Sequence, residues 1–185
     1  LPWGVILFSR NIKNYLQLKK LIFSIKKITK DKRYPILVDE EGGSVSRLYR
    51  IIDNDLYSQK YFGNIFKINH SIGLCLYKKY SDKICKILKT LGININTIPV
   101  LDMSYNFTNK FLKNRTYSSN KNSIKLMSNI CIKTYKKNKI STVIKHIPGH
   151  GLATSDSHKK LPIVTKGIDY LLKNDFKCFK NNNSL

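Results

Sequence analysis

The segment at residues 144–164 carries more chemically active side chains than any other part of the chain. It reads IKHIPGHGLATSDSHKKLPIV and places three histidines, Lys145 and an aspartate among prolines and glycines. A polar segment that glycine and proline interrupt does not pack into a core, so we expect a loop that presents its side chains. The candidates for chemistry in this loop are Lys145, His146, His150, Asp156 and His158.

Two kinds of chemistry fit these side chains. A metal site is one, but the spacing of the histidines matches no standard zinc pattern, and Lys145 would oppose a bound cation. Acid/base catalysis is the other. Asp156 and His158 lie two residues apart, so in an extended segment the carboxylate can hold and polarise the imidazole, which then donates a proton near neutral pH. The acid/base interpretation is favoured over a metal, and no cofactor is predicted. For the Asp-Ser-His sequence alone, the default interpretation is a surface loop in which the Asp and His are incidental.

Three other segments carry polar candidates. Asp39 begins the run Asp-Glu-Glu-Gly-Gly, which is either a carboxylate cluster at a strand end or a solvated turn. For Glu40 alone, an exposed position in a solvated turn is predicted, while Arg47 would lie near Asp39 if the loop turns back. Asp102 suits a turn or a helix cap as well as a ligand, and Arg115, in the sequence NRTYS, is a lone loop arginine.

The rest of the chain alternates between strand-like and helix-like segments. Short apolar runs predict strands, and apolar residues at helical spacing with lysines between them predict amphipathic helices. A polar stretch that ends at about residue 66 is expected to be irregular. The strands are expected at residues 4–8, 35–39, 93–102 and 141–145, and the helices at residues 15–30, 68–91, 123–137 and 166–179.

This alternation favours an α/β fold with a parallel sheet. The polar segments EEGGS, DMSYN and HIPGHG each follow a predicted strand. Because the carboxyl ends of parallel strands meet at one edge, these loops should converge on one pocket. We therefore expect Asp39, Arg115, His146 and His158 on the same rim.

Composition narrows the class of protein. The chain has 185 residues, enough for one domain, and a net charge of +23. That charge fits a nucleic-acid partner, but the lysines spread along the whole chain and the aromatic residues follow no RNA-stacking pattern, which favours compositional drift and no specific nucleic acid. No apolar run approaches the ~20 residues that span a bilayer, so no membrane partner is predicted. Four scattered cysteines and the lack of a secretion signal indicate reduced thiols and a cytoplasmic location.

Five segments, taken in order, resemble the β-N-acetylhexosaminidases of glycoside hydrolase family 3, the bacterial cytosolic type that recycles cell-wall fragments. GVILFSRNI (4–12) is similar to the family's opening strand and loop, and ILVDEEGGSVSRL (36–48) to its VDQEGGRVQR segment. GININTIPVLDM (92–103) is similar to its core strand and NRTYS (114–118) to its arginine loop. KHIPGHGLATSDSHKKLP (145–162) is similar to its most diagnostic segment.

The resemblance implies a fold, a reaction and residue roles. The fold is a (β/α)8 TIM barrel, and the reaction is retaining hydrolysis of terminal β-linked N-acetylglucosamine through a covalent glycosyl-enzyme. His158 would be the general acid/base and Asp156 its partner on a mobile loop. The partner molecule would be a small carbohydrate, an N-acetylglucosaminyl fragment of peptidoglycan. The residues that would hold the sugar are Asp39, Arg47, Arg115, Lys145 and His146.

The chain departs from the family in two ways. Glu40 and Ser44 replace the family's usual Gln and Arg. The length is also below the ~250 residues of a full barrel, so we expect a partial barrel at residues 1–178, with its first strand and its C-terminal strands missing, and a frayed Asn-rich tail at 179–185. The family's nucleophile, an aspartate on a later strand-end loop, has no counterpart, because Asp169 and Asp175 do not fit its motif.

Three hypotheses follow for the function. The first is a family 3 hexosaminidase represented by a truncated chain, inactive on its own. The second is a non-catalytic remnant of that enzyme that binds sugar or is decaying. The third, favoured by charge alone, is a basic nucleic-acid-binding protein.

Overall fold

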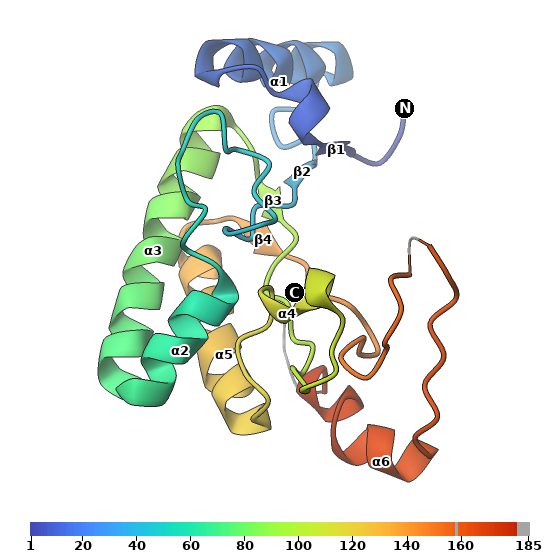
Figure 1. The fold of residues 1–185 in the computed structure, drawn as a ribbon. Coiled ribbons are helices and arrows are strands. Elements are labelled where there is room, and N and C mark those ends of the chain that lie inside the picture. Colours follow the sequence, from blue (N-terminus) through green and yellow to red (C-terminus); the bar gives the residue numbers. More distant parts are fainter. Residues whose placement is uncertain (158, 181–185) are drawn as a thin grey trace.

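The protein, seen in a computed structural model that describes residues 1–157 and 159–180, contains one four-stranded parallel sheet (Figure 1). The strands are β1 (Val5–Leu7), β2 (Ile36–Val38), β3 (Ile95–Asn96) and β4 (Ser141–Thr142). Each strand pairs in parallel with the next one along the chain. The predicted α/β fold with parallel strands is confirmed, and the strands are shorter than the apolar runs that predicted them.

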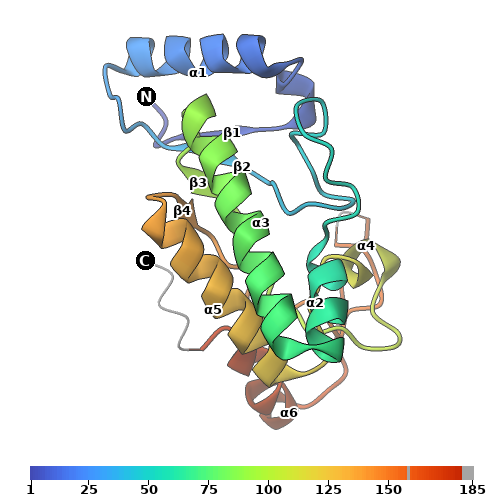
Figure 2. The same ribbon diagram turned by 90° about the vertical axis from the view of Figure 1, so that its left-hand side faces the viewer.

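Helices connect the successive strands. They are α1 (Tyr15–Thr29), α2 (Gln59–Ile68), α3 (His70–Leu91), α4 (Lys110–Lys113), α5 (Lys121–Lys137) and α6 (Ile168–Lys173), with the 3-10 helices η1 (Ser9–Asn11) and η2 (Phe176–Cys178). Figure 2 shows α3 and α5 lying side by side, with α1 crossing the end of α3. A helix between parallel strands is the arrangement that brings every strand end to the same edge.

Local signals in the sequence set the ends of these helices. Asn14 accepts a hydrogen bond from the Gln17 amide at the start of α1, and Asn69 accepts one from the Ile72 amide at the start of α3. At the other end of α3, Gly92 adopts a left-handed conformation with φ of 89°. The helix therefore stops where the sequence predicted.

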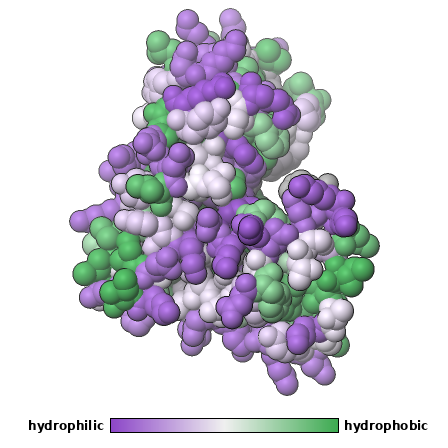
Figure 3. Space-filling model, in the orientation of Figure 1, coloured by the Kyte–Doolittle hydropathy of each residue, from purple (hydrophilic) through white to green (hydrophobic). Residues whose placement is uncertain are grey.

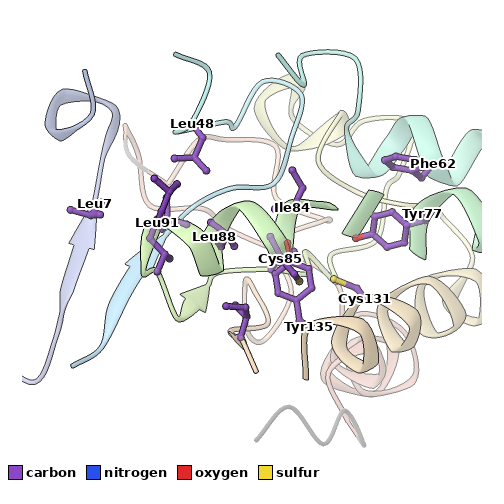
Figure 4. Close-up of a cluster of buried hydrophobic side chains, with 14 of the residues drawn as sticks. Leu7, Leu48, Phe62, Tyr77, Ile84, Cys85, Leu88, Leu91, Cys131 and Tyr135 are labelled. Atoms are coloured by element: carbon purple, nitrogen blue, oxygen red, sulfur yellow. The ribbon is translucent and has the colours of Figure 1, made fainter. Parts of the chain in front are cut away.

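The core lies between the sheet and its helices (Figure 4). Leu7 comes from β1, Leu88 from α3 and Tyr135 from α5, and all three side chains are buried. In β2, Ile36 and Val38 are both fully buried, which fixes the strand in register against its neighbours. The loop that begins at Asp39 therefore starts from a strand whose side chains are fixed in the core.

Two helices lie where the sequence predicted irregular chain or none. Helix α2 occupies the end of the polar stretch, because Phe62 and Phe66, four residues apart, bury on one face. The Ser58 hydroxyl accepts from the Tyr61 amide and begins this helix. Helix α4 is a single turn.

The C-terminal part also differs from the prediction. Helix α6 and η2 together replace the single helix expected at 166–179, because the chain leaves the helical conformation at Asn174. Phe179 packs against the core. Residues 181–185, most of the predicted tail, lie outside the described residues.

The surface keeps several apolar regions. In Figure 3 hydrophobic atoms gather at the lower left, over the junction of α2 and α3, and at the right, over the segment that leads to α6. Exposed apolar residues there are Ile68, Ile72, Leu161, Ile163 and Ile168. Within the described part of the chain, no strand pairs with the outer edge of β1 or of β4. None of the helices described is both long enough and apolar enough to cross a bilayer.

Candidate functional site

The predicted binding residues meet at the carboxyl edge of the sheet. Asp39 directly follows β2, and Lys145 and His146 follow β4, where Lys145 still pairs with Val100. Arg115 reaches the same edge from the loop after α4. The structure therefore confirms that Asp39, Arg115 and His146 share one rim.

Asp39 receives contacts from three side chains. Lys145 Nζ lies 3.2 Å from its Oδ1, and the Thr97 hydroxyl donates to the same oxygen. Arg47 Nη2 lies 3.5 Å from Oδ2, so the predicted proximity of Arg47 is confirmed. Burial alone raises the pKa of Asp39, but Lys145, Thr97 and Arg47 together outweigh burial and hold the pKa below its ordinary value. Asp39 is therefore an ionised acceptor at neutral pH.

Glu41, which the sequence did not single out, joins two of the predicted residues. Arg115 donates from Nε to Oε2 and from Nη2 to Oε1, each at 2.8 Å, and Lys145 Nζ lies 2.5 Å from Oε1. The Glu41 side chain is only 1% exposed. The sequence signal for this arrangement is the following glycine pair, because Gly42 and Gly43 both adopt positive φ, which turns the chain sharply after the carboxylates.

Glu40 is buried, so the prediction of an exposed position was wrong. It is 2% exposed, and its carboxylate accepts hydrogen bonds from Asn54 Nδ2 at 2.6 Å, the Leu48 amide at 2.8 Å and the Ser46 hydroxyl at 3.2 Å. The glycine turn folds the chain back, with Val45 accepting from the Glu41 amide, and encloses the side chain. Burial raises the pKa of Glu40 despite these hydrogen bonds.

His146 is held on both sides of its ring. Asp102 Oδ2 lies 2.6 Å from Nδ1 and accepts from the His146 amide at 3.1 Å, while Arg115 Nη2 lies 3.1 Å from Nε2. The other oxygen of Asp102 accepts from the His150 amide at 2.6 Å. Asp102, whose role the sequence left open, therefore anchors the histidine loop from below, with a side chain that is fully buried.

His150, a candidate metal ligand in the sequence, lies apart from the ionic contacts. Its ring packs edge-on against Phe111, with ring centres 5.5 Å apart, and its two ring nitrogens are buried without a hydrogen-bond partner among the described residues. Over residues 1–157 and 159–180, no three His, Cys, Asp or Glu side chains are arranged to hold a metal ion.

The predicted acid/base pair is described only in part. The Asp156 carbonyl accepts from the amides of Lys159 and Lys160, both at 3.0 Å, so the chain turns directly after Asp156. His158 lies outside the described residues. The contact between the Asp156 carboxylate and the His158 ring therefore stays a prediction.

The assembled site alternates between positive and negative groups. Its three cations are Arg47, Arg115 and Lys145, and its three carboxylates are Asp39, Glu41 and Asp102. The charges balance locally even though the whole chain carries +23. Such a site offers donors and acceptors side by side, which suits a neutral ligand rich in hydroxyl groups, whereas a phosphate would meet the carboxylates.

Sequence comparison supports this interpretation. A profile of the glycosyl hydrolase family 3 N-terminal domain matches residues 3–182. A β-hexosaminidase from Methylobacillus flagellatus is 30% identical over 179 residues, which cover 96% of this chain and 50% of that protein. The chain spans about half the length of the curated relatives it matches.

Structural comparison finds two further relatives of known structure. The crystal structure of NagZ from Neisseria gonorrhoeae in complex with N-trifluoroacetyl-D-glucosamine matches with a TM-score of 0.86 at 30% identity, covering 96% of this chain and 52% of that one. A family 3 β-N-acetylglucosaminidase from Paenibacillus sp. str. FPU-7 matches with a TM-score of 0.82 at 26% identity, covering 95% and 33%.

Proposed function

Because the chain belongs to glycoside hydrolase family 3 and its curated relatives are β-hexosaminidases, we propose that it forms the sugar-holding part of a cytoplasmic β-N-acetylhexosaminidase. The substrate is a terminal β-linked N-acetylglucosamine on a peptidoglycan fragment, and hydrolysis retains the anomeric configuration. One observation carries the proposal: five side chains expected to hold the sugar lie at one strand edge, linked by the ion pairs and hydrogen bonds described above. These residues are Asp39, Arg47, Arg115, Lys145 and His146.

The contacts suggest how the sugar is held. Asp39 is ionised and accepts hydrogens from ring hydroxyls, while Lys145 and Arg47 beside it donate to hydroxyl oxygens. Arg115, locked by Glu41, presents a fixed donor to the N-acyl or hydroxyl oxygens of the ligand. The bound N-acylated glucosamine in the NagZ complex supports this class of ligand.

Bond cleavage needs two further groups. In our proposal His158, held by Asp156, protonates the leaving oxygen and then activates the attacking water. A retaining reaction also needs a nucleophile on the opposite face of the sugar. We assign the nucleophile to the half of the relatives' length that this chain does not span, since neither Asp169 nor Asp175 fits the family motif.

Turnover of an aryl β-N-acetylglucosaminide tests the proposal. The 185-residue chain should show no rate above background, because one member of a catalytic unit is absent. A longer chain that continues into the second half of the relatives' length should turn over. In that longer chain His158→Ala should lower the rate by ~10²-fold or more, whereas His70→Ala, at an exposed position on α3, should leave it unchanged. Turnover by the short chain that His158→Ala abolishes would contradict the assignment of the nucleophile.

A sugar-binding protein without turnover is the second candidate. It is favoured by the ion pairs that already hold the proposed sugar-binding residues together at one edge of the sheet. A longer chain that binds N-acetylglucosamine but never cleaves the aryl glycoside would support this second candidate.

A further inference from the structure

We infer that Asp102 fixes His146 as the neutral tautomer with its proton on Nδ1, which makes Nε2 a hydrogen-bond acceptor at the candidate site. The inference uses two contacts on opposite sides of one ring. Asp102 Oδ2 lies 2.6 Å from Nδ1, and Arg115 Nη2 lies 3.1 Å from Nε2. It rests on the proposed function only for the identity of the ligand.

The Arg115 contact settles the state of Nε2. A guanidinium has five N–H donors and no acceptor, so a hydrogen bond between Nη2 and Nε2 requires the lone pair of the imidazole. Burial lowers the pKa of Arg115, but the paired Glu41 outweighs burial and keeps the pKa above its ordinary value. Arg115 is therefore charged, and a proton on Nε2 would point at another N–H.

The Asp102 contact settles the state of Nδ1. An ionised carboxylate is an acceptor only, so a ring nitrogen at 2.6 Å from it carries the proton. The same carboxylate accepts from the backbone amides of His146 and His150. Three N–H groups thus converge on one buried carboxylate.

The neighbouring charged groups leave this assignment intact. The Lys145 ammonium pairs with Asp39 and Glu41. The ring of His150 stands edge-on with its centre 6.2 Å from that of His146. Asp102 is therefore a positioning residue. Its fully buried carboxylate determines whether His146 Nε2 acts as a hydrogen-bond donor or as an acceptor toward a ligand.

The consequence is a rule for the ligand. His146 is 33% exposed, so a bound molecule reaches its ring. A hydroxyl that inserts between the two groups suits this pair, because it takes the Arg115 hydrogen bond from Nε2 and donates its own proton to the freed lone pair. A group that only accepts, such as a phosphate or an ether oxygen, would take the Arg115 donor away from Nε2 and leave the lone pair of His146 without a donor.

Nitrogen NMR of the histidine-labelled 185-residue chain tests the tautomer directly. The chain has four histidines, and His146→Gln assigns the signal of interest. At pH 7.5 we expect Nδ1 in the range of a protonated, pyrrole-like nitrogen and Nε2 in the range of an unprotonated, pyridine-like one. A His146 signal that is doubly protonated, or protonated on Nε2, would overturn the inference.

Substitutions then test the role of Asp102. Asp102→Asn leaves one acceptor oxygen for three N–H groups, so the Nδ1–H form should lose its dominance, whereas Asp82→Asn, on an exposed ion pair of α3, should change nothing. An unchanged His146 spectrum in Asp102→Asn would refute the positioning role. If that variant does not fold, Arg115→Gln decides: retention of the Nδ1–H form supports control by Asp102, and a switch to Nε2–H refutes it.

Added N-acetylglucosamine separates this inference from the proposed function. If the sugar binds as proposed, the Nε2 signal of His146 shifts while Nδ1 stays protonated. If the inferred tautomer is observed but the sugar shifts no His146 signal, sugar binding by this chain is contradicted while the tautomer is confirmed. A shift accompanied by protonation of Nε2 would contradict the acceptor role.

Discussion

Arg115 and Glu41, separated by 74 residues in the sequence, make a two-point contact in which Nε and Nη2 each donate to one carboxylate oxygen at 2.8 Å. Both side chains are nearly buried, at 11% and 1% exposure. The contact ties the loop after β2 to the loop after α4. Because Arg115 also reaches His146, this pair connects the loops that follow three different strands.

Arg115→Lys should lower the free energy of unfolding although it conserves the charge. A lysine ammonium cannot match the two carboxylate oxygens with two parallel N–H groups, and the lost charge-assisted hydrogen bond is worth about 2 kcal/mol. The free energy of unfolding in urea measures this loss. Arg33→Lys, at an exposed position, is the matched control. Equal free energies of unfolding for the two variants would show that the two-point contact between Arg115 and Glu41 does not stabilise the protein.

Glu40→Gln should stabilise the protein at neutral pH and have little effect at acid pH. Burial raises the folded-state pKa of Glu40 above its unfolded value, so the wild type loses stability as pH rises through that folded pKa. An amide avoids the loss, and Asn54, whose Oδ1 is buried without a partner among the described residues, can rotate its own amide to accept from it. The family carries Gln here by resemblance.

Unfolding free energies from pH 4 to pH 8 check this prediction. The difference between Glu40→Gln and wild type should grow with pH to the order of 1 kcal/mol, the scale of one hydrogen bond. Asp53→Asn, at an exposed position close by, should show no such trend. If the difference in unfolding free energy stays constant or shrinks as pH rises, ionisation of the Glu40 carboxyl does not destabilise the folded state, and the prediction is wrong.

Gly63→Ala should destabilise the protein although alanine is the better helix former. A Cβ at Gly63 would lie 2.0 Å from the Tyr117 carbonyl oxygen, which belongs to the loop that carries Arg115. Alanine favours a helix by only ~1 kcal/mol, and overpacking against backbone costs ~1–3 kcal/mol. Thermal unfolding measures the balance. Gly167→Ala meets nothing within 4 Å and should be tolerated, so similar melting temperatures for the two variants would refute close packing at Gly63.

The open edge of β4 should promote self-association of the chain. Among the described residues no strand covers this edge, and Val143, which continues β4, is 42% exposed. An unpaired strand edge recruits other chains. We expect sedimentation at moderate salt to detect larger species that Val143→Lys suppresses. Suppression to the same degree by Ile68→Lys, on the distant apolar surface between α2 and α3, would show that general hydrophobicity is responsible.

The sequence predicted the site better than it predicted the surroundings of the site. Asp39 and Lys145 follow apolar strands, and strand ends of a parallel sheet must meet, so their proximity could be foreseen. Glu41 was not singled out and the role of Asp102 was left open. The glycine pair after Glu41 signals a tight turn, but it does not tell whether that turn encloses the carboxylate or leaves it in solvent. Helix α2 was missed because only two large apolar side chains, Phe62 and Phe66, are buried on its inner face.

We propose that this chain by itself holds N-acetylglucosamine at the carboxyl edge of its sheet. Titration of the folded chain with N-acetylglucosamine, followed by calorimetry, measures it most directly. We predict binding by the wild type, a loss of at least ~10-fold in affinity for Lys145→Met, equivalent to ~1.4 kcal/mol, and unchanged affinity for Lys136→Met on the exposed face of α5. No binding by the folded wild type, or equal binding by both variants, would contradict the claim.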